Sequence, residues 1–166
     1  IVVETPRARP DGTVLLSENA AVSSALGSAS VQVTGNTTLR TVASSTVVQR
    51  TLNNAFTLQS GATLTVDAAS TNGTLSLNGV INGSGHLAIT SAATTAVIIT
   101  GDIQITGTTT VQATSLLQIG NGGTTGTLAS ASVSLASGAI LRFHRSDASN
   151  FNSAVTGTGS FEKMGA

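Results

Sequence analysis

The sequence predicts an all-β protein, a right-handed parallel β-helix (β-solenoid) of about seven coils. Three observations lead to this fold class. Apolar residues alternate with polar ones along short segments, glycine and asparagine separate these segments, and similar segments recur in the same order further along the chain. Such a pattern is typical of strands rather than helices, because alternate residues of a strand share one face.

The expected strands are short and regularly spaced. Val31 and Val33 flank Gln32, and Leu64 and Val66 flank Thr65. Alternation of this kind places aliphatic side chains inward and Thr, Ser or Gln outward. Turn signals separate the strands, namely Gly35-Asn36, Ser60-Gly61, Asn72-Gly73, Gly83-Ser84-Gly85, Gly120-Asn121-Gly122-Gly123 and Gly157-Thr158-Gly159.

Three pairs of segments match in order. They are VQVTGNTTLR (31–40) with IQITGTTTVQ (103–112), FTLQSGATLTV (56–66) with VSLASGAILRF (133–143), and INGSGHL (81–87) with VTGTGSF (155–161). Their offsets of 72, 77 and 74 residues indicate an internal duplication, 31–90 and 103–164, although chance similarity between simple sequences is the competing interpretation. A coil of roughly 20–25 residues makes each offset three coils. A sandwich needs no such repetition, whereas a solenoid buries like residues against like.

The matched segments define the candidate core. In these segments Phe56, Phe143 and Phe161 stand opposite Val133, Val66 and Leu87, as inward-facing positions allow. The core residues expected to carry the structure are Leu64, Val66, Leu141, Phe143 and Phe161.

The N-terminal residues differ from the rest. Residues 4–12, ETPRARPDG, are charged and hold both prolines of the chain. We therefore predict a linker or N-terminal cap over residues 1–12, which blunts the open edge of the first coil, and a solenoid over residues 13–166.

Composition limits the function. Only 8% of the residues are charged, and seven Lys and Arg balance seven Asp and Glu, so no basic surface for nucleic acid is expected. Aromatic residues make up 2%, which disfavours a compact carbohydrate-binding module. The chain has no cysteine, so we expect a repetitive core to stabilise it without disulfides. It has no long apolar run, and from its first residues we expect no signal peptide in this segment.

Few residues could perform catalysis. Asp67, Asp102 and Asp147 are the only carboxylates between Arg40 and Glu162. A polysaccharide-degrading β-helix needs such groups clustered on adjacent coils, and here only a chance stacking would cluster them. We expect no catalytic residues and no cofactor.

The stretch RFHRSDASN, residues 142–150, is the most polar part of the chain. It could hold a small anion or a metal, but a turn held by contact between Arg145 and Asp147 is the favoured interpretation. His86 and His144 lack companion ligands at metal spacing. Residues 120–123, GNGG, lack the Lys and helix of a phosphate cradle and predict a corner between coils.

Residues 117–166 resemble the passenger-associated transport repeat of Gram-negative autotransporters. The shared elements are the LQIGNGG opening, the SGAILRF strand, the HRSD turn and the GTGSFEKMG closing. Residues 31–90 are similar only loosely, because they lack the Arg-Ser-Asp turn. The resemblance implies a right-handed parallel β-helix in a secreted passenger, exported by an outer-membrane β-barrel of the same parent chain. Since the family usually continues past the final Gly with another strand, we expect this chain to be a fragment.

The expected function is therefore structural. The hypothesis is a stalk segment of an adhesin-like autotransporter passenger, extracellular and displayed on the bacterial surface. An alternative is a binding module whose solenoid surface contacts a host surface or another copy of the chain. A polysaccharide-degrading enzyme is the third hypothesis.

Overall fold

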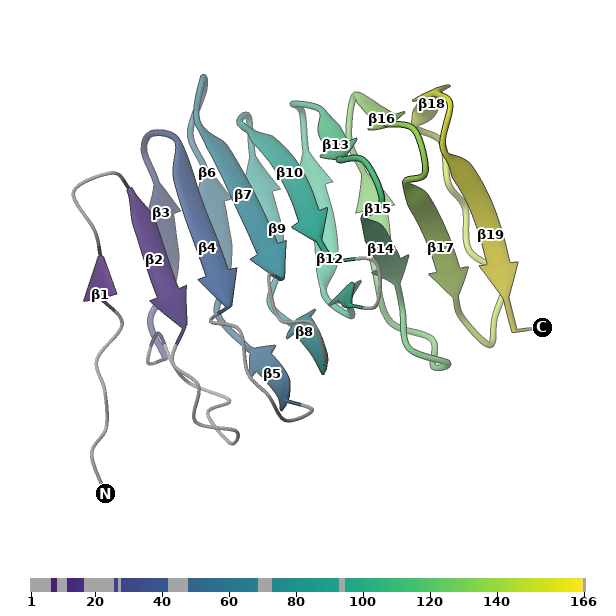
Figure 1. Ribbon diagram of the computed structural model, residues 1–166, viewed down its shortest axis with the longest axis horizontal. Helices are drawn as coiled ribbons and strands as arrows, with labels where there is room; N and C mark the ends of the chain where they lie inside the picture. The colour runs from purple at the N-terminus through teal and green to yellow at the C-terminus, as the bar shows by residue number, and fades with distance from the viewer. Residues whose placement is uncertain are drawn as a thin grey trace.

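Parallel strands in three sheets form a β-solenoid of about five turns (Figure 1). The computed structural model describes residues 7–8, 12–16, 26, 28–41, 48–68, 73–92 and 95–165. None of these residues is helical, so the prediction of an all-β solenoid is confirmed for the described part of the chain.

The strands of each sheet follow one another along the solenoid axis. Sheet A has eight strands: β1 (Arg7–Ala8), β2 (Thr13–Leu16), β4 (Thr37–Thr41), β7 (Thr63–Ala68), β10 (His86–Ser91), β13 (Thr109–Val111), β16 (Ser132–Leu135) and β18 (Ala154–Gly157). Sheet B has five: β3 (Val31–Val33), β6 (Phe56–Leu58), β9 (Ile81–Gly83), β12 (Asp102–Ile105) and β15 (Thr127–Ala129). Sheet C has six: β5 (Val48–Leu52), β8 (Gly73–Leu77), β11 (Ala96–Ile99), β14 (Leu116–Ile119), β17 (Ile140–His144) and β19 (Ser160–Met164).

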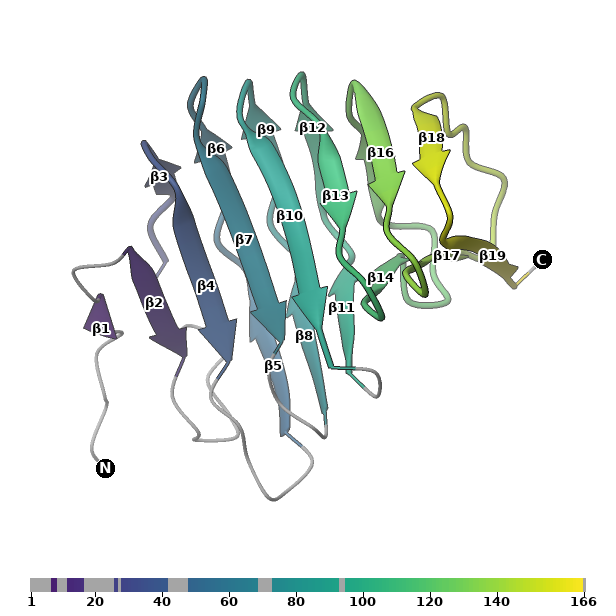
Figure 2. The ribbon, with the colours of Figure 1, turned by 45° about the horizontal axis from the view of Figure 1, so that its top comes forward.

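Each coil passes through sheet B, then sheet A, then sheet C, as β6, β7 and β8 do (Figure 2). Register partners in neighbouring coils lie between 20 and 27 residues apart, as the pairs Ile99–Ile119 and Leu39–Val66 show. The strands keep their register because loops at the corners absorb the differences in coil length.

One strand runs against the others. β1 pairs antiparallel with β2 at the edge of sheet A, with Arg7 opposite Leu15 and Ala8 opposite Val14. It lies in the segment predicted as a linker or cap, and it occupies one edge of sheet A. Residues 1–6 and 9–11 lie outside the described residues.

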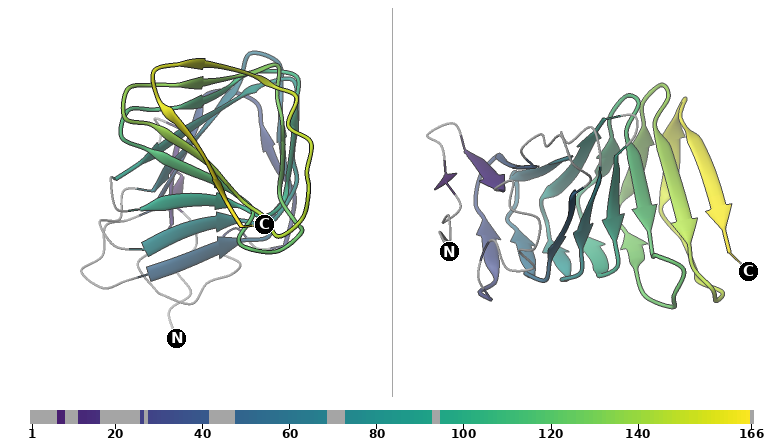
Figure 3. Two further views of the ribbon diagram at one scale, coloured as in Figure 1. Left: turned by 90° about the vertical axis from the view of Figure 1, so that its right-hand side faces the viewer. Right: turned by 60° about the horizontal axis from the view of Figure 1, so that its bottom comes forward.

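The core is a column of aliphatic side chains inside the coils. In sheet C, for example, one inner row runs through Leu75, Val97, Leu117 and Leu141, all fully buried. Neighbouring strands lie about 4.8 Å apart, so these side chains contact one another from coil to coil. Figure 3 (left) looks along the solenoid, where successive coils overlap around this interior.

Glycine is required at particular corners. Gly83, the last residue of β9, has φ of 111°, and a Cβ there would lie 2.2 Å from the carbonyl oxygen of Leu58 in the preceding coil. Gly157, the last residue of β18, has φ of 103°, and its Cβ would lie 2.0 Å from the oxygen of Leu135. Only glycine accommodates both the conformation and the close approach.

The first matched pair of segments occupies equivalent places. Val31 pairs with Phe56, Phe56 with Ile81, and Ile81 with Ile103. Residues 31 and 103 therefore lie in the same row of sheet B, three coils apart, as the 72-residue offset predicts.

The other two matched pairs lie in different sheets. β7 belongs to sheet A, whereas β17, which carries the matching sequence, belongs to sheet C. Likewise β9 lies in sheet B and β18 in sheet A. What the matched segments share is a corner of the coil. Each corner is a tight turn that contains a glycine with positive φ, Gly61 in one segment and Gly138 in the other. In the next coil, a Gly-x-Gly turn packs against this corner. The duplication itself stays a prediction.

Candidate functional site

Four of the five predicted core residues lie in the interior. Leu64, Val66 and Leu141 are fully buried, and Phe143 is nearly so. Leu64 and Val66 face inward from β7, and Leu141 and Phe143 face inward from β17. The matched sequences thus do contribute equivalent inward positions, but to different sheets.

The prediction for Phe161 is wrong, because this side chain is 53% exposed. Phe161 occupies the inner row above Leu141. No described strand lies beyond β19 in sheet C, so one face of the ring lacks a neighbour. Phe161 therefore points toward the interior, as core residues do, but it lies in the last described coil, where no further described strand covers it.

The polar turn after β17 is held by an ion pair. Arg145 Nε lies 2.9 Å from Asp147 Oδ1, and Arg145 Nη2 lies 2.8 Å from Asp147 Oδ2. Arg145 Nη1 donates to the carbonyl oxygen of Gly126 in the coil below. Although Arg145 is only 8% exposed, its charge is therefore matched by a bidentate carboxylate and a carbonyl. The predicted contact between Arg145 and Asp147 is confirmed.

This ion pair sets the charge state of Asp147. The hydrogen bond from Arg145 holds the pKa of the Asp147 carboxyl below its ordinary value of 3.8, partial desolvation opposes the shift, and the charge of Arg145 adds to it. Asp147 is consequently ionised over the whole neutral range and is no candidate for a general acid.

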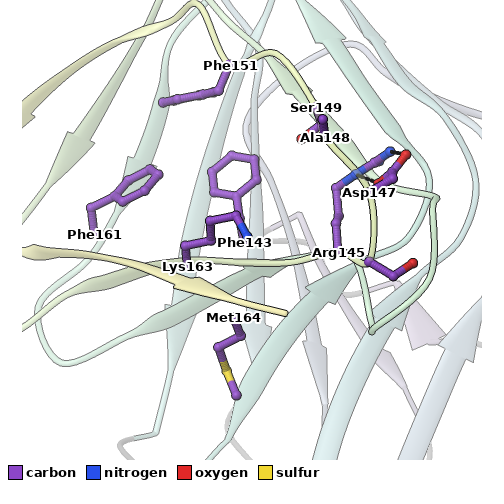
Figure 4. Close-up of a pocket in the computed structure, with 10 residues that line it drawn as sticks. Phe143, Arg145, Asp147, Ala148, Ser149, Phe151, Phe161, Lys163 and Met164 are labelled. Carbon is purple, nitrogen blue, oxygen red and sulfur yellow. Dashed lines mark hydrogen bonds and ion pairs between the residues drawn. The ribbon is translucent and has the colours of Figure 1, made fainter. Parts of the chain in front are cut away.

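An aromatic cluster adjoins the ion pair (Figure 4). The ring centroids of Phe143 and Phe151 lie 5.1 Å apart, and those of Phe143 and Phe161 lie 5.5 Å apart. The three rings line an open cavity of about 440 Å³, with Arg145 and Lys163 among its other residues. Lys163 occupies the inner row above Phe143. The cavity can therefore accept apolar groups, and a cation lies beside them.

The carboxylates considered for catalysis lie apart. Asp67 is in β7 of sheet A and pairs with Arg40, with 2.7 Å between the oxygen and Nε. Asp102 begins β12 of sheet B and accepts a hydrogen bond of 2.8 Å from Thr127. Asp147 lies in the turn after β17. Asp67 and Asp102 each join neighbouring coils, whereas Asp147 binds Arg145 within its own turn, and the three do not form a cluster.

The two histidines lie in different sheets. His86 begins β10, where its Nδ1 lies 2.9 Å from Thr108 Oγ1 in the next coil and accepts a hydrogen bond from the backbone N–H of Thr108. His144 ends β17. Within the described residues, no group of three or more His, Asp or Glu side chains could hold a metal ion.

The Gly120–Gly123 stretch forms a corner between coils, as predicted. The backbone N–H of Gly122 donates to the carbonyl of His144, and the N–H of Ser146 donates to the carbonyl of Gly123. These bonds connect the corner to the turn of the following coil, which also carries Arg145.

Sheet A presents a row of hydroxyl groups on its outer face. Neighbours in register along this row are Thr13, Thr38, Thr65, Ala88, Thr110, Ser134 and Thr156. Ala88 is the only member without a hydroxyl. These residues give the outer face of sheet A a neutral, hydrogen-bonding coat.

Two ion pairs between neighbouring strands were not predicted from the sequence. Arg40 faces Asp67, and Arg142 faces Glu162, with 2.8 Å between Arg142 Nε and the carboxylate oxygen. The partners are 27 and 20 residues apart, and each spacing equals the length of the coil at that place. Opposite charges one coil apart could therefore have predicted these pairs. The spacing could not be used beforehand, because the length of the coil varies along the chain.

No family model matches the chain, and no curated protein or solved structure matches it either. Within the described residues, no helix has the length and apolar character needed to cross a membrane.

Proposed function

We propose that this chain is a structural stalk, a segment of a secreted, surface-displayed and adhesin-like autotransporter passenger. The observation that carries the proposal is the continuous core, in which inward rows of Leu, Ile and Val run from coil to coil. A rod built in this way lengthens with each added coil and needs no chemistry at its surface. The resemblance of residues 117–166 to the passenger-associated transport repeat supports the same assignment.

The proposal includes a right-handed winding and about seven coils. The longest sheet supports the number of coils, because β1 is the single antiparallel strand among its eight. It also includes the mechanism that the resemblance implies. An outer-membrane barrel of the parent chain exports the passenger, and each coil that folds outside the cell stabilises the next and draws more chain across.

The surface suits an extracellular rod. Asp67 and Glu162 each pair with an arginine of a neighbouring strand, and the hydroxyl row covers sheet A. A neutral coat of this kind is hydrated without repelling other copies. It serves as a spacer that holds a functional domain away from the cell.

The substitution Phe143→Asp tests the proposal. It places a carboxylate at the nearly buried position of Phe143, beside the rings of Phe151 and Phe161, so we expect the surrounding coils to unfold and protease resistance to be lost. With the chain fused between a secretion leader and an outer-membrane barrel, we expect much less of the variant at the cell surface. Gln104→Asp is the matched control, since Gln104 is exposed on β12. Undiminished display of unfolded Phe143→Asp would contradict the stalk mechanism.

One observation favours a second candidate, a module that binds another copy of the chain or a host surface. The outer face of sheet A carries the uncharged hydroxyl row, in which only Ala88 has no hydroxyl. Hydroxyl groups donate and accept hydrogen bonds, so this face offers contacts to a host surface or to the same face of another copy.

A further inference from the structure

We propose that the outer face of sheet B binds a neutral sugar residue of a glycan. The sugar site is defined as Val80, Asn82 and Asp102, which would contact the sugar, and Thr127, which holds Asp102 in place. It lies in the middle of the rod, where β9 has β6 on one side and β12 on the other (Figure 2). The inference goes beyond the stalk proposal, and it concerns a different face from the hydroxyl row of sheet A.

Asp102 is the one carboxylate in the described part of the chain that no arginine neutralises. The other three each pair with an arginine, namely Asp67 with Arg40, Asp147 with Arg145, and Glu162 with Arg142. Asp102 instead accepts a hydrogen bond of 2.8 Å from Thr127 Oγ1 in the following coil. A carboxylate can accept about four hydrogen bonds, so the half-buried Asp102 can accept further ones from a ligand.

Val80 places an apolar side chain directly beside this carboxylate. Val80 precedes Ile81 and Asp102 precedes Ile103, and these two isoleucines are register partners in neighbouring coils. Val80 is 36% exposed, and among the described residues it is the one large exposed apolar residue outside β18 and β19. Because described coils lie on both sides of it, its exposure does not depend on where the stack ends.

Asn82 adds a carboxamide to the same face. It follows Val80 by two residues, and alternate residues of a strand share one face. Its side chain is half-buried and forms no hydrogen bond with another described residue. A carboxamide both donates and accepts hydrogen bonds, so Asn82 can bind a hydroxyl group in either direction.

The spacing of these three side chains suits a single sugar ring. Neighbouring coils lie about 4.8 Å apart, which separates Val80 from Asp102, and two residues along a strand span about 6.7 Å, which separates Val80 from Asn82. A pyranose has an apolar C–H face and a rim of hydroxyl groups. With the C–H face on Val80, hydroxyl groups of the rim would reach Asp102 on one side and Asn82 on the other.

The charge of this face selects an uncharged sugar. The five described strands of sheet B contain no Lys or Arg, and Asp102 is their only charged residue. The carboxylate would repel an acidic glycan. The hydroxyl groups of a neutral sugar supply the hydrogen-bond donors that Asp102 would otherwise take from water.

The site is open and has no aromatic ring on which a sugar could stack. We therefore expect weak binding, with a dissociation constant of about 1–10 mM for a short oligosaccharide. Contacts of this strength hold a rod against a surface only when many copies act together. The low aromatic content of the chain limits the strength of such a site and does not prevent it.

Nuclear magnetic resonance titration of the ¹⁵N-labelled chain tests the proposal. The probes are three neutral pentasaccharides, namely cellopentaose, maltopentaose and N-acetylated chitopentaose. We expect at least one of them to shift the backbone amide signals of residues 80–83 and 102–104 and to leave those of sheets A and C unchanged. Asp102→Asn should weaken this binding at least about 10-fold, since it removes a charged hydrogen-bond acceptor.

Glu162→Gln is the charge-matched control, because it also removes one carboxylate but on sheet C, where Glu162 pairs with Arg142. We expect its sugar binding to equal that of the parent chain, and thermal unfolding shows that each variant is folded. The proposal would be overturned if none of the three probes bound, if Asp102→Asn bound equally well, or if a heparin pentasaccharide bound in place of the neutral sugars. Each of these results would leave the stalk proposal unaffected.

Discussion

Thr109 interrupts an inner row that is otherwise aliphatic from Leu64 to Val155. It lies in sheet A between Leu87 and Val133, is fully buried, and its hydroxyl has no hydrogen-bond partner among the described residues. Burial of an unpaired hydroxyl destabilises the folded state. We therefore expect Thr109→Val to raise the free energy of unfolding by about 1 kcal/mol, measured by urea denaturation.

Thr110→Val is the matched control for this substitution. Thr110 belongs to the outer hydroxyl row and is half-buried, so its hydroxyl is within reach of water. We expect a change within about 0.5 kcal/mol there. A loss of stability in Thr109→Val would show that the Thr109 hydroxyl is satisfied after all.

The Arg145–Asp147 ion pair predicts a pH dependence. Because Arg145 lowers the pKa of Asp147 in the folded state, the carboxylate stabilises the fold above the ordinary pKa of 3.8, and this stabilisation is lost as pH falls through the lowered folded value. Asp147→Asn should therefore be less stable than the parent chain at neutral pH. The difference in thermal midpoint should shrink below about pH 4, and a difference independent of pH would contradict the ion pair.

At the scale of the element, the corners carry the most specific demands. Gly83→Ala would require a side chain at φ of 111° and a Cβ 2.2 Å from the Leu58 oxygen. We expect it to destabilise the chain by more than about 1 kcal/mol in a thermal melt. At Gly35, where a Cβ would meet nothing within 4 Å, the same change should have little effect. Equal tolerance at Gly83 and Gly35 would contradict the described stacking of coils.

The sequence was sufficient for the strands and their inward residues. Alternation identified β7 and β17, and it correctly placed Leu64 and Leu141 in the core. It could not assign each strand to a sheet, because the Ser-Gly-Ala turn forms both the corner before β7 and the corner before β17. A local motif specifies a turn, whereas the sheet depends on how many turns precede it.

The terminal coil shows the same limit. Phe161 and Leu87 occupy matched positions, each two residues after the second glycine of a Gly-x-Gly turn. Leu87 is buried between β7 and β13, whereas Phe161 has a described strand on one side only. Exposure of this kind depends on position along the stack and not on local pattern. The Arg145–Asp147 contact, in contrast, was predictable because its partners are two residues apart.

At the scale of the whole molecule, the account depends on successive coils lying in register. The solenoid gives a rod with one continuous core and a neutral surface. The proposed stalk uses the length of this rod, and the proposal would fail if the paired strands of sheet A were not neighbours.

Disulfide trapping in sheet A is the most direct test of this register. Thr110 and Ser134 are register partners, so their Cα atoms lie at a separation that a disulfide can bridge. Thr65 and Thr110 both pair with Ala88 and are therefore two coils apart, which is beyond the reach of a disulfide. On mild oxidation of the folded chain, the account predicts a bond in Thr110→Cys/Ser134→Cys and none in Thr65→Cys/Thr110→Cys. A bond in the second pair, or none in the first, would contradict it.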